Sequence, residues 1–209
     1  MQALHDAFFN EDYDFLHVRD VLPGFYVLLG DWKIYPDEPT PALEQNGKAW
    51  SDALSSGVAG IMTKTIGSRY QRFLDNIGAY FYFPLAIAKN SYGQDGVFSV
   101  KALVFSGKID AAAGLAFGVK NSGNYFVWRV NALEDNAILF EFVNNRRIQH
   151  AEVSLPVKQD LWYHLEVRIQ RTRLDTYLDG ARLVSHEASS AIEGHLALWS
   201  KADSRAFQL

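Results

Sequence analysis

From Val97 onward, hydrophobic residues occur in short runs separated by turn-forming residues. Each run is rich in Val, Leu, Phe, Tyr and Trp, and Gly, Asn, Asp or Pro interrupts the pattern roughly every 8 to 12 residues. Helical periodicity is scarce in this part of the chain. The pattern predicts β-strands over Val97–Phe105, Ala113–Val119, Tyr125–Asn131, Ala137–Val143, Ile148–Leu155, Trp162–Gln170, Leu174–Leu178, Ala181–His186 and Gly194–Ser200.

The Asp179-Gly180 step predicts a tight hairpin. An Asp-Gly dipeptide favours a two-residue type I′ turn, because both central residues need a positive φ. Pairing outward from this turn predicts the facing pairs Leu178 with Ala181, Tyr177 with Arg182, and Thr176 with Leu183. The strand before this hairpin alternates cleanly between apolar and polar residues. Its best register pairs Ile169 with Leu174 and Arg168 with Asp175.

A second hairpin is predicted around a five-residue loop, Ala132–Asn136. Its register places Phe126, Trp128 and Val130 against Phe142, Phe140 and Ile138, an apolar face that we interpret as core. The opposite face then carries Tyr125, Arg129, Leu139 and Glu141. This second face is a mixture, too apolar to be wholly exposed and too polar to be wholly core.

The first 96 residues follow a less regular pattern. A strand is predicted over Gly30–Tyr35, followed by a loop with three prolines. Lys48–Asn76 has the composition of one or two short helices, for example Ser68–Asn76. The apolar run Gly78–Ala88 follows, and Pro84 argues against a regular central strand there. Because no repeat or linker interrupts the chain, we expect a single domain over residues 1–209.

Composition and charge narrow the classes of function. The chain has 209 residues, of which 48% are hydrophobic and 21% charged, as in an ordinary globular domain. Its net charge is −4, which gives no electrostatic footprint for nucleic acid. The absence of cysteine excludes disulfides and thiolate chemistry. No segment is apolar for long enough to predict membrane insertion, and the start of the chain shows no signal peptide.

Several motifs of the C-terminal half occur together in a known superfamily. They are Ala113-Gly114-Leu115-Ala116-Phe117, Asn124-Tyr125, the run from Arg129 to Asn136, Trp162, Tyr177-Leu178-Asp179-Gly180, and the run from Leu198 to Ser204. Because these motifs occur in this order, the chain resembles the concanavalin A-like lectin/glucanase superfamily, particularly laminin-G-like domains of uncharacterised bacterial exported proteins. The resemblance implies a jelly-roll β-sandwich of two antiparallel sheets and a secreted or periplasmic location. Relative to this family, a partly irregular or helical insertion is expected near residues 48–82, and a short or missing last strand.

The resemblance implies a non-catalytic carbohydrate-binding, lectin-like module. Tyr125, Arg129 and Glu141 are the candidate ligand-binding residues, because an aromatic ring stacks on a sugar while Arg and Glu bond its hydroxyls. The alternative interpretation of these residues is an Arg–Glu pair beside a half-buried tyrosine, which only stabilises the sheet. The oligomeric state is left open by the sequence.

Two other functions are kept open. The glucanase branch of the superfamily carries carboxylates at alternate positions of one strand, and no such run occurs here. If the protein is instead a hydrolase or lyase acting on glycosides, Glu141 or Glu166 is the expected acid/base. The third function is that of a structural or protein-interaction domain.

Metal ligands are sparse in the sequence. His150, His164, His186 and His195 lie on different predicted strands and show no metal-ligand spacing. Asp95-Gly96 and Glu134-Asp135-Asn136 are oxygen-rich loops that suit either calcium or simple turn formation. Because turn formation is the commoner use of such residues, no cofactor is expected, with calcium as the alternative.

Overall fold

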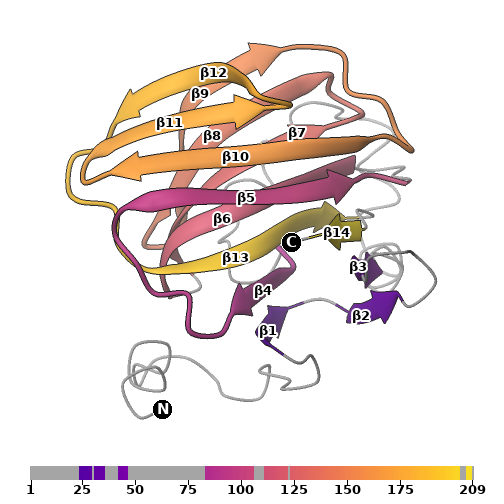
Figure 1. Ribbon diagram of the computed structural model, residues 1–209, viewed down its shortest axis with the longest axis horizontal. Coiled ribbons are helices and arrows are strands. Elements are labelled where there is room, and N and C mark those ends of the chain that lie inside the picture. Colours follow the sequence, from indigo (N-terminus) through magenta and orange to yellow (C-terminus); the bar gives the residue numbers. More distant parts are fainter. Residues whose placement is uncertain are drawn as a thin grey trace.

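A computed structural model describes residues 24–29, 31–35, 42–46, 83–105, 111–121, 123–202 and 206–208. These residues form two antiparallel sheets packed face to face, and no helix occurs among them (Figure 1). The two-sheet prediction is therefore confirmed. The insertion and the helices expected between residues 48 and 82 lie outside the described residues. The described part of the chain contains no helix of the length and hydrophobicity that a membrane span needs.

Each sheet has seven strands among the described residues. Sheet A has the order β1-β4-β13-β6-β7-β8-β9, and sheet B has the order β12-β11-β10-β5-β14-β3-β2. The strands of sheet A are β1 Phe25–Leu29, β4 Leu85–Ala88, β13 His195–Ala202, β6 Ala111–Asn121, β7 Asn124–Asn131, β8 Asn136–Val143 and β9 Arg146–Ser154. The strands of sheet B are β12 Ala181–Glu187, β11 Arg173–Leu178, β10 Trp162–Gln170, β5 Gly96–Leu103, β14 Ala206–Gln208, β3 Ala42–Asn46 and β2 Asp31–Tyr35.

All strands predicted from Val97 onward are present, with ends shifted by one or two residues in most cases. The last strand, β14, is short as expected and lies between β5 and β3. Strands β1 and β3 are not in the sequence prediction. Strand β4 corrects the interpretation of the Pro84 run, since it lies inside sheet A between β1 and β13. Pro84 precedes the first residue of β4, and its missing N–H therefore removes no bond from the ladder.

The Asp179-Gly180 turn forms as predicted. Both residues have positive φ, 48° and 82°. The pairs Leu178 with Ala181 and Tyr177 with Arg182 are present, as are both predicted pairs between β10 and β11. One prediction is wrong, because a bulge opposite the Thr176–Tyr177 step places Thr176 against Val184 rather than Leu183. The bulge adds one residue to β12, which moves every later pair by one position.

The register predicted between β7 and β8 is wrong by one residue. Asn136 begins β8 and pairs with Asn131, so the turn contains four residues instead of five. Its last residue, Asp135, adopts a left-handed φ of 50°. As a result Phe126 faces Glu141 and Trp128 faces Leu139. A shift of one residue turns a whole strand over relative to its neighbour, so the predicted division between core and mixed face is also wrong.

The main core lies between the sheets. Sheet A contributes alternate residues such as Leu115, Trp128 and Leu139, and sheet B contributes residues such as Leu165 and Val167, all of them 3% exposed or less. Trp128 also links the two layers, since its indole Nε1 donates a hydrogen bond of 3.0 Å to the Tyr177 carbonyl oxygen. This core fixes which side chains of β7, β8 and β13 lie on the outer face of sheet A.

Candidate functional site

The outer face of sheet A is apolar and buried, which is unusual for one face of an antiparallel sheet. The residues that alternate with the inter-sheet core form a second hydrophobic cluster across β4, β13, β6, β7 and β8. Phe83, which comes just before β4, packs on this face with its ring centroid 5.1 Å from that of Trp199 and 5.4 Å from that of Phe142. Sheet A therefore separates two apolar layers.

Strand β6 makes a trough in this face. Before the irregularity that follows Phe117, its outward positions carry only small residues, Ala112, Gly114 and Ala116, whereas the strands on both sides carry large ones. Gly114 lies between Trp199 of β13 and Arg129 of β7. A Cβ atom at Gly114 would lie 2.7 Å from the Arg129 Cβ and 2.8 Å from the Trp128 carbonyl oxygen. Only glycine therefore allows β7 to bring Arg129 this close to the trough.

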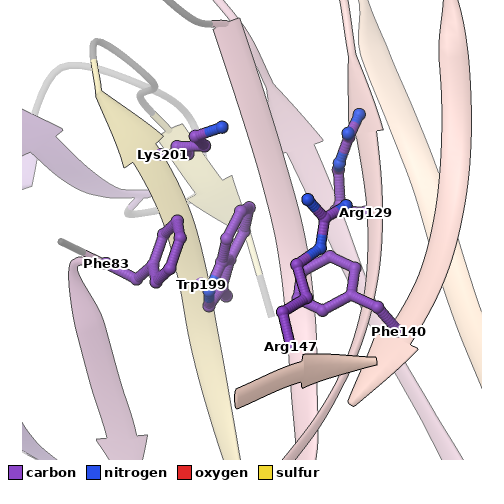
Figure 2. A pocket seen from close by; sticks show the side chains of 6 residues that line it. All are labelled: Phe83, Arg129, Phe140, Arg147, Trp199 and Lys201. Atoms are coloured by element: carbon purple, nitrogen blue, oxygen red, sulfur yellow. The ribbon is translucent and has the colours of Figure 1, made fainter. Parts of the chain in front are cut away.

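A small pocket lies over the trough. Figure 2 shows its lining, which combines three aromatic and three cationic side chains: Phe83, Phe140, Trp199, Arg129, Arg147 and Lys201. The Trp199 ring lies edge-on to the Phe140 ring, with centroids 5.6 Å apart. The free space between these side chains is about 10 Å³, roughly the room that one water molecule needs.

Arg129 is the centre of the polar part of the pocket. Although only 4% exposed, it donates a hydrogen bond of 2.6 Å from Nη1 to Asn136 Oδ1 and one of 2.7 Å from Nη2 to Glu134 Oε2. The turn between β7 and β8 supplies both acceptors, since the Asn131–Asn136 pair closes it on the same face. Burial of Arg129 is thereby compensated, and its guanidinium is held in one orientation.

The network continues outward along β9. The Asn136 amide donates to Glu152 Oε1 at 2.8 Å, and the Gln149 amide donates to Glu152 Oε2 at 3.0 Å. Arg147 lies beside Gln149 with its guanidinium carbon 4.5 Å from the centroid of the Phe140 ring. A connected series of amide, carboxylate and guanidinium groups thus runs from the buried trough to the exposed residues of β9.

Two pKa shifts describe the electrostatics of this face. Burial alone would raise the pKa of the Glu134 carboxyl, but the charges of Arg129 and Lys201 and the bonds from Arg129 and Asn136 outweigh it and hold the pKa below its usual value. Burial raises the pKa of the Tyr125 phenol far above its usual range. The nearby Trp199 indole lowers that pKa slightly. In the described part of the chain, however, no atom has the geometry of a hydrogen bond with Trp199 Nε1.

The predicted ligand-binding residues are only partly brought together. Arg129 lines the pocket, and Tyr125 lies on the same outer face but is 3% exposed and packed against Phe142. Glu141 lies on the opposite face of sheet A, because the true register pairs it with Phe126 rather than placing it beside Arg129 and Tyr125. The prediction that the three share one face is therefore wrong.

Glu141 belongs to a different cluster, at the edge where β9 and β12 approach each other. His150 Nε2 of β9 lies 3.2 Å from Glu141 Oε1, and the ring of His186 on β12 lies 4.1 Å from that of His150 between centroids. Burial raises the pKa of Glu141 and lowers the pKa of both imidazoles. The cluster thus joins the edges of the two sheets away from the pocket.

Glu166 lies on β10 in sheet B, on the face that points away from the core. Its Oε1 accepts a hydrogen bond of 2.7 Å from Arg168 Nε. Glu141 and Glu166 therefore lie in different sheets and do not face a common groove. The predicted pair of Arg168 with Asp175 is a neighbouring strand pair, but Asp175 bonds the Arg173 Nε at 3.3 Å.

Both loops proposed for calcium use their oxygens within the protein. Asp95 Oδ1 accepts a hydrogen bond from the Arg171 N–H at 2.6 Å, and Asp135 Oδ1 accepts one from the Val157 N–H at 3.0 Å. Among the described residues, no group of three or more histidine or acidic side chains has an arrangement suited to a metal ion. The expectation of no cofactor, with calcium as the alternative, stays a prediction.

Several pocket residues are missing from the sequence prediction, namely Phe83, Phe140, Trp199, Lys201 and Arg147. Phe140 was assigned to the core through the wrong register. Trp199 and Lys201 are two residues apart on one strand and so share a face, but a tryptophan in a strand is usually core. The small outward residues of β6 are the signal that would have located the trough.

Comparison with solved structures identifies the fold. The chain is similar to the carbohydrate-binding module CBM66 from Bacillus subtilis, with a TM-score of 0.65 and 17% identity, over 90% of this chain and 94% of the module. A Bacillus subtilis protein of unknown function with a galectin-like fold matches with a TM-score of 0.54 and 9% identity, over 88% of this chain and 86% of that protein.

No protein-family model matches the chain, and no curated protein matches its sequence. At such low identities the structural likeness shows the fold alone, and the laminin-G-like and bacterial exported assignments stay predictions. The described architecture and these neighbours agree on one conclusion: the chain has the concanavalin A-like jelly-roll fold.

Proposed function

We propose that the protein is a carbohydrate-binding, lectin-like module that binds its ligand at the exposed β9 rim of the pocket on the outer face of sheet A. The observation that carries the proposal is the series of fixed planar polar groups, from Arg129 through Asn136 and Glu152, laid beside an aromatic floor. Such groups hold two acceptors or donors in one plane, which suits neighbouring hydroxyls of a sugar ring. The similarity in fold to a carbohydrate-binding module supports the proposal.

The pKa values and positions of the carboxylates favour binding over glycoside cleavage. Cleavage needs a carboxylic acid whose pKa is raised so that it can donate a proton. Glu134, which contacts the pocket arginine, has a lowered pKa and stays ionised at neutral pH. Glu141 has the raised pKa that an acid needs, but it lies on the other face of the sheet.

A glycan-array screen with turnover assays on every hit tests this proposal. We expect binding without product formation, and a loss of roughly 10-fold or more for Arg147→Ala, since a hydrogen bond to a charged group contributes about 1.5–3 kcal/mol. Arg168→Ala is the matched control, because Arg168 is 51% exposed on the outer face of sheet B. Cleavage of a hit would favour the enzyme. Absence of any binding, or equal binding by the two variants, would overturn the proposal.

A further inference from the structure

An exposed aromatic ring lies at the end of sheet A where β13 begins. Alternation along β13 places His195, Ala197 and Trp199 on the outer face of the sheet. The Tyr92 ring contacts the His195 imidazole edge-on, with centroids 5.2 Å apart. His195 is 2% exposed, whereas Tyr92 is 58% exposed, more than any other tyrosine, phenylalanine or tryptophan among the described residues. The outer face is therefore buried at His195 and opens to solvent at Tyr92.

The backbone holds Tyr92 in place. The connection between β4 and β5 passes beside the start of β13 (Figure 1), and Gly93 forms an antiparallel bridge there with Gly194, in which each N–H bonds the other's carbonyl oxygen at 3.0 Å. Before Tyr92, the Ser91 hydroxyl donates to the last carbonyl of β4 at 2.6 Å and accepts from the Leu196 N–H at 3.0 Å. A ligand that contacts this ring therefore orders little of the chain when it binds.

The same bridge fixes a polar pair beside the ring. In an extended segment, the residues before and after one position point to the same side, so Gln94 and Glu193 share a side with Tyr92 and His195, roughly 7 Å further along. Gln94 Nε2 donates to Glu193 Oε2 at 2.8 Å. Within the described part of the chain this is the one hydrogen bond of either side chain, so both Oε1 atoms can accept bonds from a ligand.

This arrangement suits an uncharged sugar ring. A T-shaped contact covers at most one face of an aromatic ring, which leaves the other face of Tyr92 open for the C–H groups of a pyranose. Hydroxyls at the edge of that pyranose can bond the Gln94 and Glu193 oxygens. Burial lowers the pKa of His195, so its imidazole is neutral at pH 7 and the Glu193 carboxylate is the only charge on the four side chains. This carboxylate repels an acidic sugar.

We propose that Tyr92, Gln94 and Glu193 form a second carbohydrate-binding site, in which one uncharged pyranose stacks on the Tyr92 ring while its hydroxyls bond Gln94 and Glu193. The inference rests on the proposed carbohydrate-binding function and adds a site and a ligand class to it. The β9 rim lies at the same end of sheet A, four strands away from β13. At about 4.8 Å per strand, roughly 19 Å separates the two sites, so only a glycan of several residues can reach both.

The test is calorimetry with the disaccharide and the hexasaccharide of four neutral series, the cello-, xylo-, manno- and galacto-oligosaccharides, and with oligogalacturonates of the same lengths. We expect a neutral hexasaccharide to bind more tightly than its disaccharide, and the galacturonates to bind more weakly than the galacto-oligosaccharides. Tyr92→Ala should lower affinity for that neutral hexasaccharide roughly 3- to 10-fold, whereas Tyr92→Phe, which keeps the ring, should not.

Two further variants sharpen the test. Phe105→Ala is the matched control, because it removes another exposed aromatic ring, 36% exposed, from the connection that follows β5, and it should bind like the native protein. Glu193→Gln keeps a planar acceptor but removes the charge, so it should bind the galacturonates more tightly than the native protein does. Because the Tyr92 ring is mostly exposed, Tyr92→Ala should melt at the native temperature.

The outcomes separate the two proposals. Native affinity in Tyr92→Ala with a loss in Arg147→Ala would overturn the second site and leave binding at the β9 rim intact. A loss in Tyr92→Ala with native affinity in Arg147→Ala would support the second site and overturn the β9 rim. Equal losses in Tyr92→Phe and Tyr92→Ala would overturn stacking on the ring, and tighter binding of the galacturonates would overturn the uncharged ligand. If no probe binds, both proposals fail.

Discussion

The outer faces of the two sheets are built differently. On sheet B, strand β10 alternates between buried Tyr163, Leu165 and Val167 and outward His164, Glu166 and Arg168. On sheet A, strand β7 is buried at both kinds of position, so that Val127 and Trp128 are each 0% exposed although they point to opposite sides. Strand β10 therefore buries one face, and strand β7 buries both.

This difference bears on the proposed binding site. A charged outer face, such as that of β10 and β11, is bound by water and by its own ion pairs. A second apolar layer lowers the solubility of a protein unless something covers it. It also gives Arg129 an environment of low dielectric constant, in which a buried guanidinium is a stronger hydrogen-bond donor than in water. The pocket therefore lies on the face where alternation is lost.

The largest expected effect comes from placing a charge on each outer face. Val127→Asp puts an unpaired carboxylate into the second apolar layer, and we expect a loss of about 4 kcal/mol or more in the free energy of unfolding. Gln170→Asp on the exposed end of β10 should change it by less than about 0.5 kcal/mol. Urea denaturation measures both. A loss below about 1 kcal/mol for Val127→Asp would mean that the outer face of sheet A is open to water.

A second comparison concerns two arginines. Arg129→Met leaves Asn136 Oδ1 and the Glu134 carboxylate without their donor, and we expect a loss of about 2 kcal/mol. Arg168→Met removes an exposed side chain and should leave the melting temperature unchanged. Thermal unfolding of the two variants side by side checks this. Equal melting temperatures would show that Arg129 does not hold the β7–β8 turn.

A third prediction concerns the turn in sheet B. Gly180→Val should cost about 1–2 kcal/mol, because Gly180 has a φ of 82° and a β-branched residue is strained there. No heavy atom lies within 4 Å of the added Cβ, so the cost arises from the backbone alone. Gly180→Asn is the control, because asparagine tolerates this conformation. Unchanged stability with lost glycan binding would place the turn in the site.

The same difference between the faces explains how far sequence reasoning reaches. The alternation of polar and apolar residues identified the register of β10 with β11, because Arg168 and Ile169 can only point to opposite sides of the sheet. It failed for β7 and β8, since Tyr125, Phe126, Val127 and Trp128 are apolar in succession and every register looks equally good. The turn itself gives no further constraint, because Asn136 fits a loop as well as a strand end.

The candidate site was only partly predictable for a related reason. Arg129 was identified because an arginine can bond sugar hydroxyls, but its expected neighbour was Glu141, whereas its actual partners are Glu134 and Asn136. Trp199 and Lys201 reach the pocket from a strand some 70 residues later, through pairing of β13 with β6. No local pattern encodes that neighbourhood. It arises from the jelly-roll topology.

The smallest expected effect concerns the contact between the sheets at β9 and β12. Burial lowers the pKa of His150 and of His186, and the charge of His150 lowers that of His186 further, while Glu141 and Glu187 oppose this. Below about pH 6.5 the unfolded chain therefore binds more protons at these imidazoles than the folded chain, and stability falls as the pH falls through that region. Burial raises the pKa of Glu141, so just above pH 4.5 the folded chain binds more protons at this carboxyl than the unfolded chain does. Stability at this group therefore rises as the pH falls through that region, which offsets part of the loss.

We therefore expect the double variant His150→Gln with His186→Gln to lose less stability than the native protein between about pH 7.5 and pH 5.5. His164→Gln is the matched histidine substitution on the outer face of sheet B, away from the contact between β9 and β12. Urea midpoints measured across this range provide the test. Parallel curves for the native protein and the double variant would show that the two histidines do not link the sheets through their protonation.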